Sequence, residues 1–228
     1  MRFIALLCLL TTAYAFSDEA LPAPYNTLKE ILPFDSGGWY ANASPMEALL
    51  KSKSAKIVIE LGSWKGTSTR HIAGCLPEDG RVYAVDHWFC PPYDDPNSIG
   101  CANENIYTLY QQFLSNVIHA KLTHKITPIR MTTGEALVVF MDQDIKPDLI
   151  YVDSAHDEVS VYQDIAMYFP LVKGHGVICG DDWGWGIGWG YTADHLPVQS
   201  AVIRYAEENN LLIEVHNQNF WILYEQNP

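Results

Sequence analysis

Three aspartates stand where two hydrophobic runs of the chain end. Asp153 closes the run 149–153, and Asp181 and Asp182 directly follow the run 176–180. If these runs are neighbouring parallel strands, three carboxylates at one edge of a sheet would repel one another unless a cation lay between them. Oxygen ligands with room for water favour Mg²⁺, with Mn²⁺ or Ca²⁺ as alternatives. A helix cap at Asp153 and a solvated turn at Asp181 and Asp182 are the competing interpretation.

A glycine-containing turn follows an earlier hydrophobic run. Glu60 is followed by Gly62, Ser63 and Gly66 in a G-x-x-x-G pattern that leads into a helix. Gly62 allows a tight turn, and Gly66 allows a ligand or the next helix to approach the backbone closely. The pattern differs from the G-x-G-x-x-G of nicotinamide-binding proteins, and a purely structural strand-to-helix turn would also explain it.

Two further strand ends carry residues suited to a nucleoside. Asp86 and His87 end the next hydrophobic run, where a carboxylate can accept both hydroxyl hydrogens of a ribose. Together with the glycine turn, Asp86 predicts a nucleoside ligand. The segment 132–136, which contains Gly134 and Glu135, could border an adenine or simply cap a helix.

The elements that must position these residues alternate between strand and helix patterns. Near-continuous apolar runs, typical of strands covered on both faces, lie at 57–61, 82–86, 126–130, 149–153 and 176–180. The spacing of an amphipathic helix is shown by Ile106, Leu109, Tyr110, Phe113 and Val117, and again by Val161, Ile165 and Tyr168. Further helices are expected at 45–51 and 198–208, and an antiparallel hairpin at 211–216 and 220–224. The alternation predicts an α/β fold with a doubly wound, mostly parallel sheet.

Composition excludes several classes of protein. The chain has 228 residues, of which 48% are hydrophobic and 18% charged, enough for one sizeable core and unlike a disordered, collagen-like or coiled-coil chain. A formal charge of -13 argues against a nucleic-acid partner. We expect one globular domain at 55–228, preceded by an arm and a helix at 16–54.

The first residues predict an export signal. Arg2 precedes the apolar run 3–13, and Ala13-Tyr14-Ala15 is a small-x-small cleavage site, so we expect a signal peptide at 1–15. The run is shorter than the roughly 20 residues that span a bilayer, and no other stretch comes close. The expectation is therefore an exported protein, periplasmic or secreted, without a stable membrane span.

Four cysteines would remain after cleavage. Cys90 and Cys101 flank a loop rich in turn-forming residues, which a disulfide could close in an exported chain; two free thiols are the alternative. Cys75 and Cys179 stand in apolar surroundings and are expected to be buried.

The motifs together resemble those of class I S-adenosylmethionine-dependent methyltransferases, over roughly residues 55–224. In that family the acidic residue and the glycine turn after the first strand hold the methionine part of the donor, and the acid after the second strand holds the ribose. The resemblance implies a Rossmann-like sheet of seven strands that ends in a hairpin. It also implies a donor site formed by Glu60, Gly62, Ser63, Gly66, Asp86, His87, Gly134 and Glu135.

The segments 148–156 and 176–183 narrow the resemblance to the branch that methylates hydroxyls of sugars and natural products. They are similar to metal-dependent catechol-type O-methyltransferases, in which an aspartate after the fourth strand and an acidic pair after the fifth bind Mg²⁺. Asp153, Asp181 and Asp182 occupy the matching positions. His156 occupies the position at which those relatives carry a lysine, and the resemblance implies that it acts as a general base. A neutral imidazole can take the proton of a hydroxyl group. A capping or surface histidine is the alternative.

We therefore expect a metal-assisted S-adenosylmethionine-dependent O-methyltransferase acting on a small-molecule, glycan or phenolic hydroxyl, with Asp153 and His156 at its catalytic centre. The aromatic and glycine residues of 183–191 could stack on a flat acceptor and close over it, or pack on the domain; Trp39 and Tyr40 could cover the same cleft. A nicotinamide-dependent oxidoreductase and a secreted, non-catalytic effector or binding protein remain as alternatives. A homo-oligomer also stays open.

Overall fold

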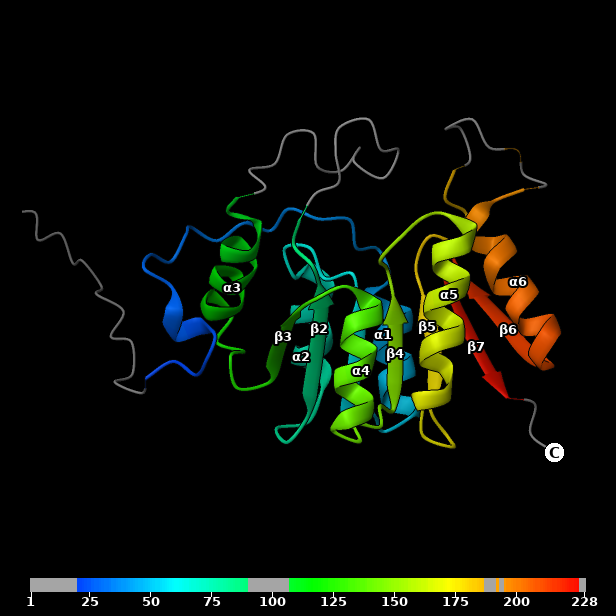
Figure 1. Ribbon diagram of the computed structural model, residues 1–228, viewed down its shortest axis with the longest axis horizontal. Helices are drawn as coiled ribbons and strands as arrows, with labels where there is room; N and C mark the ends of the chain where they lie inside the picture. Colours follow the sequence, from blue (N-terminus) through cyan, green and yellow to red (C-terminus); the bar gives the residue numbers. More distant parts are fainter. Residues whose placement is uncertain (1–19, 90–106, 187–191, 193–194, 226–228) are drawn as a thin grey trace, which may run out of the picture.

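A seven-stranded sheet forms the centre of the protein, as a computed structural model of residues 20–89, 107–186, 192 and 195–225 shows (Figure 1). Its strand order is β3-β2-β1-β4-β5-β7-β6; the first five strands are parallel, and β7 pairs antiparallel with both β5 and β6. The strands are β1 (Ile57–Leu61), β2 (Arg81–Asp86), β3 (Ile126–Arg130), β4 (Leu149–Val152), β5 (Val177–Gly180), β6 (Leu211–His216) and β7 (Phe220–Glu225). The predicted fold class is confirmed.

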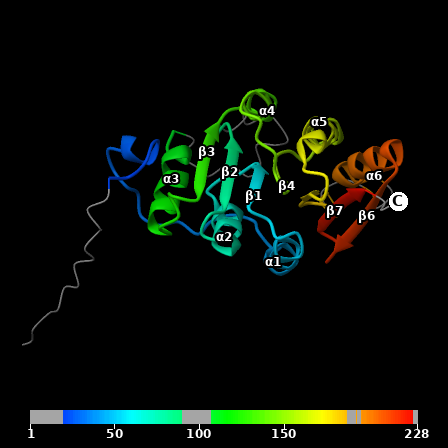
Figure 2. The ribbon, with the colours of Figure 1, turned by 90° about the horizontal axis from the view of Figure 1, so that it is seen from below.

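Helices cover the sheet on both faces. Figure 2 shows α1, α2 and α3 on one face and α4, α5 and α6 on the other. The helices are α1 (Ala43–Ser52), α2 (Thr67–Cys75), α3 (Leu109–His119), α4 (Thr133–Asp142), α5 (Glu158–Tyr168) and α6 (Pro197–Asn209), with short 3-10 turns η1 (Tyr25–Thr27) and η3 (Phe169–Leu171). The helix patterns of the sequence are confirmed, except that Ile106 lies outside the described residues.

Two hydrophobic cores follow from this layering. Side chains alternate along a strand, so Val58 of β1 packs into the core under α1, α2 and α3, while Ile59 packs into the core under α4, α5 and α6. Every residue of β4 and β5 is buried. Continuous apolar runs are the pattern that such doubly covered parallel strands require.

Strand register brings the predicted site residues to one edge of the sheet. Leu61 of β1 is paired with Val152 of β4, and Val152 is paired with Gly180 of β5. The residues that follow these strands, among them Gly62 and Asp153, therefore emerge side by side. This is the edge at which parallel α/β sheets bind their ligands.

An irregular N-terminal arm, residues 28–42, runs from η1 past α3 to α1 (Figure 1). It is fixed to α3 by side chains: Ser115 accepts a hydrogen bond from the Leu32 N–H (3.0 Å), and Asn116 exchanges two bonds of 2.9 Å with the backbone of Asp35. Residues 28–42 contain neither helix nor strand.

The two cysteines that the structure describes differ in exposure. Cys179 is fully buried in β5, as expected, but Cys75 is exposed, so that expectation was wrong. Cys75 ends α2, where its neighbours Ile72 and Ala73 turn inward to the core and leave the thiol on the outer face.

Some sequence predictions fall outside the described residues. These are the signal peptide at 1–15, the Cys90–Cys101 pair with its loop, and most of the aromatic segment beyond Gly186. Within the described ranges, every helix is too short or too polar to cross a membrane.

Candidate active site

Asp153, His156 and Asp182 meet at the carboxyl ends of β4 and β5. One side-chain ligand atom from each lies within 4.8 Å of the others. The Asp182 Oδ2 is 2.9 Å from the His156 Nε2, and both side chains keep a quarter to a third of their surface exposed, at 23% and 33%. Asp153 and Asp182, two of the three aspartates expected at a metal site, thus lie together with His156, and their roles stay predictions.

Asp181 lies behind this group. It is buried, its Oδ2 accepts a hydrogen bond from the Tyr151 hydroxyl (3.2 Å), and its Oδ1 accepts from the Asp182 N–H (2.7 Å) and from the Asn219 amide. Its carboxylate thus joins the end of β5 to β4 and to the β6–β7 turn. A metal role for Asp181 stays a prediction, since its oxygens already have partners within the chain.

The acidic cluster is electrostatically strained. Burial raises the pKa of Asp153 well above its usual range, and the charges of Asp181, Asp182 and Glu60 raise it further. Burial and the Asp182 charge also raise the pKa of Asp181. A divalent cation would relieve this repulsion, because it would favour the charged carboxylates.

Asp182 is held in an uncommon backbone conformation. Its φ of 64° lies in the left-handed region, which non-glycine residues seldom adopt and which aspartate tolerates better than most. The backbone conformation and the Asp181 bond to its N–H together set the direction of the Asp182 side chain.

The turn after β1 requires glycine at position 62. Gly62 has a φ of +86°, and a Cβ there would lie 1.9 Å from the Asp153 carbonyl oxygen. Gly66, with a φ of +79°, precedes α2 and faces the Phe113 ring of α3, which a Cβ would meet at 2.9 Å. The close approach predicted at these glycines is therefore made by other parts of the chain: the Asp153 backbone lies against Gly62, and the Phe113 ring lies against Gly66. The contact at Gly62 brings the glycine turn next to the acidic cluster.

Glu60 is fully buried beneath this turn. Its Oε2 accepts hydrogen bonds from the hydroxyls of Ser63 (2.7 Å) and Thr69, whereas its Oε1 has no hydrogen-bond partner among the described residues. Burial raises the pKa of Glu60. A buried carboxylate oxygen without a partner is costly, so this atom fits a donor such as the ammonium of an amino-acid ligand.

Asp86 supports the glycine turn from the end of β2. Its Oδ2 accepts hydrogen bonds from the N–H groups of Ser63 (3.1 Å) and Trp64 (2.9 Å), and its Oδ1 accepts from the Trp88 N–H (2.6 Å). His87 beside it is half exposed. Both residues lie at the predicted place, and their contact with a ribose stays a prediction.

The segment after β3 forms a helix cap. The Thr132 hydroxyl accepts from the Glu135 N–H (3.3 Å), and the Glu135 carboxylate accepts from the Thr132 N–H (3.0 Å), which is a complete capping box. The cap that the sequence analysis considered is present. An adenine contact by Gly134 and Glu135 stays a prediction.

Three residues that the sequence analysis did not single out fix the arm to the glycine turn. The buried Lys65 donates to the Asp35 carboxylate at 2.8 Å, and Asn116 of α3 donates to the carbonyl oxygens of both residues at 2.9 Å. A lysine inside the turn was the available signal, because a buried ammonium needs a partner. Its partner lies 30 positions earlier in the chain, where no local pattern marks it.

Aromatic side chains border both halves of the site. Trp185 stacks on His156 with ring centroids 4.8 Å apart, whereas Trp183 packs against the core under α5 and α6. In the arm, Trp39 is 73% exposed and lies beside the Trp64 ring. Tyr40 turns the other way and packs on His71 and Tyr151, so it does not share the exposed position of Trp39.

Comparison with known proteins gives the class. Residues 59–183 match a family model described as a methyltransferase domain, and the chain belongs to that family. With the 3-2-1-4-5-7-6 sheet, this defines the protein as a class I S-adenosylmethionine-dependent methyltransferase.

Individual relatives are O-methyltransferases by description. An Arabidopsis thaliana protein described as a caffeoyl-CoA O-methyltransferase is 27% identical over 191 residues, which cover 79% of this chain and 72% of that protein. The structure of the O-methyltransferase from Bacillus cereus in complex with SAH is similar to this one, with 16% sequence identity and a TM-score of 0.60. The match covers 90% of this chain and 84% of the Bacillus cereus chain. The O-methyltransferase TomG of Streptomyces achromogenes, solved in complex with SAM, is 16% identical with a TM-score of 0.60. The match covers 85% of this chain and 83% of TomG. These two structures support the fold.

Proposed function

We propose that the protein transfers a methyl group from S-adenosylmethionine to a hydroxyl of a small-molecule acceptor, with the help of a divalent cation. The observation that carries the proposal is the convergence of Asp153, His156 and Asp182 within 4.8 Å, directly beside the glycine turn. A Cβ on Gly62 would overlap the Asp153 carbonyl oxygen, so the donor turn and the acidic cluster are in backbone contact.

The donor half of the site is assigned to the glycine turn and its supports. S-adenosylmethionine supplies a sulfonium methyl group when it is bound. The Glu60 Oε1, which lacks a partner within the described chain, is suited to the donor's ammonium, and we assign the ribose to Asp86 at the end of β2. Further contacts of the donor are proposed for Ser63, Gly66, His87, Gly134 and Glu135.

The residues of the acidic cluster fit a hard divalent cation such as Mg²⁺. Asp153 and Asp182 offer carboxylate oxygens, and Asp181 stands behind them as a further carboxylate. A cation held there would acidify and orient an acceptor hydroxyl. The raised pKa of Asp153 agrees with such a site, because the repulsion that raises it is what a cation would offset.

His156 is suited to accept the proton of that hydroxyl. With Nε2–H donating to the Asp182 Oδ2 at 2.9 Å, Nδ1 is the nitrogen of the neutral tautomer that can take a proton. The Trp185 ring stacks on the imidazole and limits its rotation. Binding of the donor and the acceptor in line within one site can lower the activation barrier by roughly 7–11 kcal/mol through positioning alone.

A flat, phenolic acceptor is favoured over a glycan. Trp185 beside His156 and the exposed Trp39 beside Trp64 present aromatic faces on which a ring could stack. The description of the Arabidopsis relative as a caffeoyl-CoA enzyme points the same way. A glycan acceptor stacking on the same rings remains the second candidate.

Two further properties are proposals from the sequence. We expect export through the leader at 1–15, which N-terminal sequencing of the mature protein would test. Self-association, which the sequence left open, would be measured by sedimentation at several protein concentrations.

The experiment combines donor binding with methyl transfer. The chain is titrated with S-adenosylhomocysteine and with NAD, and then incubated with radiolabelled S-adenosylmethionine and phenolic or sugar acceptors, with Mg²⁺ or with EDTA. We expect binding of S-adenosylhomocysteine and transfer to a phenol that EDTA abolishes. Binding of NAD alone would instead support an oxidoreductase, and the absence of both would support a non-catalytic protein.

A further inference from the structure

A second group of metal-ligating side chains lies on the face of the sheet covered by α1 and α2. Glu47 projects from α1, and His71 and Cys75 lie one turn apart on α2. The Glu47 Oε1 is 3.0 Å from the His71 Nε2, the Cys75 Sγ is 3.7 Å from the same nitrogen, and one ligand atom from each of the three residues lies within 4.8 Å of the others. The methyl-transfer proposal uses none of them.

Two of the three separations between the ligand atoms are close to those around a tetrahedral cation, and the third is within 4.8 Å. With Zn–S near 2.3 Å and Zn–N or Zn–O near 2.0 Å, tetrahedral angles place sulfur and nitrogen about 3.5 Å apart, and nitrogen and oxygen about 3.3 Å apart. The observed distances are 3.7 Å and 3.0 Å. The three ligands therefore need shifts of only a few tenths of an ångström along these two edges.

The imidazole is already oriented by a fourth residue. The Tyr40 hydroxyl lies 2.9 Å from the His71 Nδ1, so Nδ1–H can donate to Tyr40 while Nε2 points toward Glu47 and Cys75. Metal-bound histidines characteristically use their second nitrogen in this way. Tyr40 lies near the end of the N-terminal arm and packs on Tyr151, whose hydroxyl donates a hydrogen bond to Asp181.

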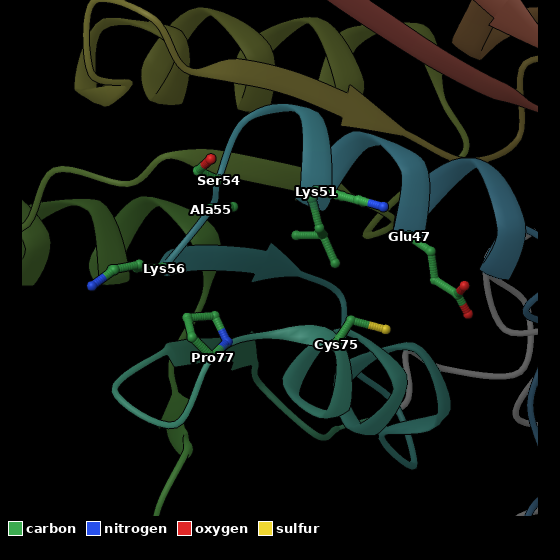
Figure 3. A pocket seen from close by; sticks show the side chains of 8 residues that line it. Glu47, Lys51, Ser54, Ala55, Lys56, Cys75 and Pro77 are labelled. Atoms are coloured by element: carbon green, nitrogen blue, oxygen red, sulfur yellow. The ribbon is translucent and has the colours of Figure 1, made fainter.

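A cavity of about 480 Å³ opens beside the group and is lined in part by Glu47, Lys51 and Cys75 (Figure 3). Figure 3 shows the Cys75 side chain extending from α2 toward the Glu47 side of α1. A cation held by three protein atoms keeps a fourth position, and the cavity gives water or a small ligand access to it.

We propose that Glu47, His71 and Cys75 bind a transition-metal cation, Zn²⁺ in the first place, at a site separate from the acidic cluster. A thiolate and an imidazole select such a metal, whereas the carboxylates near β4 and β5 suit Mg²⁺. Binding forms one bond from each ligand atom to the metal and releases the Cys75 thiol proton to solvent. The bound ion would link α1 to α2 and, through Tyr40, hold the end of the arm.

Cobalt absorption tests the site without reference to methyl transfer. Co²⁺ is titrated into the full chain, kept reduced with a phosphine, and the thiolate-to-cobalt charge-transfer band is recorded. We expect a band that saturates at one equivalent, that one equivalent of Zn²⁺ removes, and that excess Mg²⁺ leaves unchanged. No band, or a band that Zn²⁺ cannot displace, would overturn the proposal.

Substitutions identify the residues that bind the Co²⁺ ion responsible for this band. Cys75→Ser should abolish it, Glu47→Gln should weaken the Co²⁺ affinity at least ten-fold, and Tyr40→Phe should weaken it by about 10- to 100-fold. The matched controls Glu78→Gln, at an exposed glutamate, and Asp182→Asn, in the acidic cluster, should keep the band and the affinity. A band that persists in Cys75→Ser would arise from other thiols and would contradict the site. Because Cys75 is exposed, metal-free Cys75→Ser should unfold at the same temperature as the parent chain.

Discussion

The Asp35 carboxylate of the N-terminal arm accepts a hydrogen bond from the buried Lys65 ammonium of the glycine turn at 2.8 Å. Lys65 is only 7% exposed in its side chain, whereas Asp35 is 40% exposed. The arm thus supplies the charge that a buried lysine needs, and the turn that we assign to the methyl donor depends on a segment that precedes the sheet.

Replacement of this carboxylate should loosen the arm. Asp35→Asn removes the carboxylate charge that lies 2.8 Å from the Lys65 ammonium, and we expect the free energy of unfolding to fall by about 1–2 kcal/mol, less than for a fully buried pair because Asp35 is partly solvated. Urea denaturation at pH 7 measures the loss. Asp79→Asn, which removes an exposed pair with Lys56, is the control and should leave the free energy of unfolding nearly unchanged, because water screens an exposed pair.

The same pair predicts a dependence on pH. The Lys65 hydrogen bond holds the pKa of Asp35 below its usual range. The stabilisation is therefore fully present above the unfolded-state pKa of about 3.9, and it is lost as the pH falls through the lower, folded-state pKa. The difference between the parent chain and Asp35→Asn should shrink below pH 4. A difference that stays constant from pH 7 to pH 3 would contradict the role of this pair.

Gly62 and Gly134 should respond oppositely to alanine. At position 62 the new Cβ would lie 1.9 Å from the Asp153 carbonyl oxygen at a φ of +86°, so we expect a loss of several kcal/mol in unfolding free energy. At position 134, in the first turn of α4, a Cβ would meet nothing within 4 Å, and we expect a gain of about 0.4–1 kcal/mol. Chemical denaturation of the two variants checks both signs. Equal effects would show that the turn relaxes away from Asp153.

His156 should affect turnover without affecting donor binding. His156→Asn removes the proposed proton acceptor, and general-base catalysis typically contributes about 10²–10⁴-fold to the rate. We expect kcat to fall in that range while the S-adenosylhomocysteine Kd stays within two-fold. His195→Asn, at a largely exposed histidine, serves as the control and should leave both unchanged. An unaltered kcat in His156→Asn would assign the proton to another acceptor.

Local patterns predicted most of the sheet, for a physical reason. A strand covered on both faces must be apolar at successive positions, so the runs at 57–61 and 126–130 coincide with β1 and β3. Because parallel strands end at one edge, the sequence alone predicts that Asp153 and Asp182 lie together. In the structure, one carboxylate oxygen of Asp153 lies within 4.8 Å of one carboxylate oxygen of Asp182.

The remaining features depend on contacts between distant parts of the chain. Asp181 accepts hydrogen bonds from Tyr151 and from Asn219, which follows 38 residues further on. The residues next to Asp181 in the sequence therefore did not predict that its carboxylate is buried behind Asp153 and Asp182. Asn116 holds Asp35 across 81 positions. The exposure of Cys75 depends on which side of α2 faces the sheet at the final turn, and apolar neighbours alone did not decide it.

The central claim is that Asp153 and Asp182 hold a divalent cation beside the methyl donor. Its most direct test is isothermal titration with Mg²⁺ in the presence of saturating S-adenosylhomocysteine, on the parent chain, Asp153→Asn, Asp182→Asn and the surface control Asp142→Asn. We predict one Mg²⁺ per chain for the parent and for Asp142→Asn, and at least a ten-fold weaker affinity in the two cluster variants, all four binding S-adenosylhomocysteine alike. Equal Mg²⁺ affinity in all four chains, or no binding to the parent, would contradict the account.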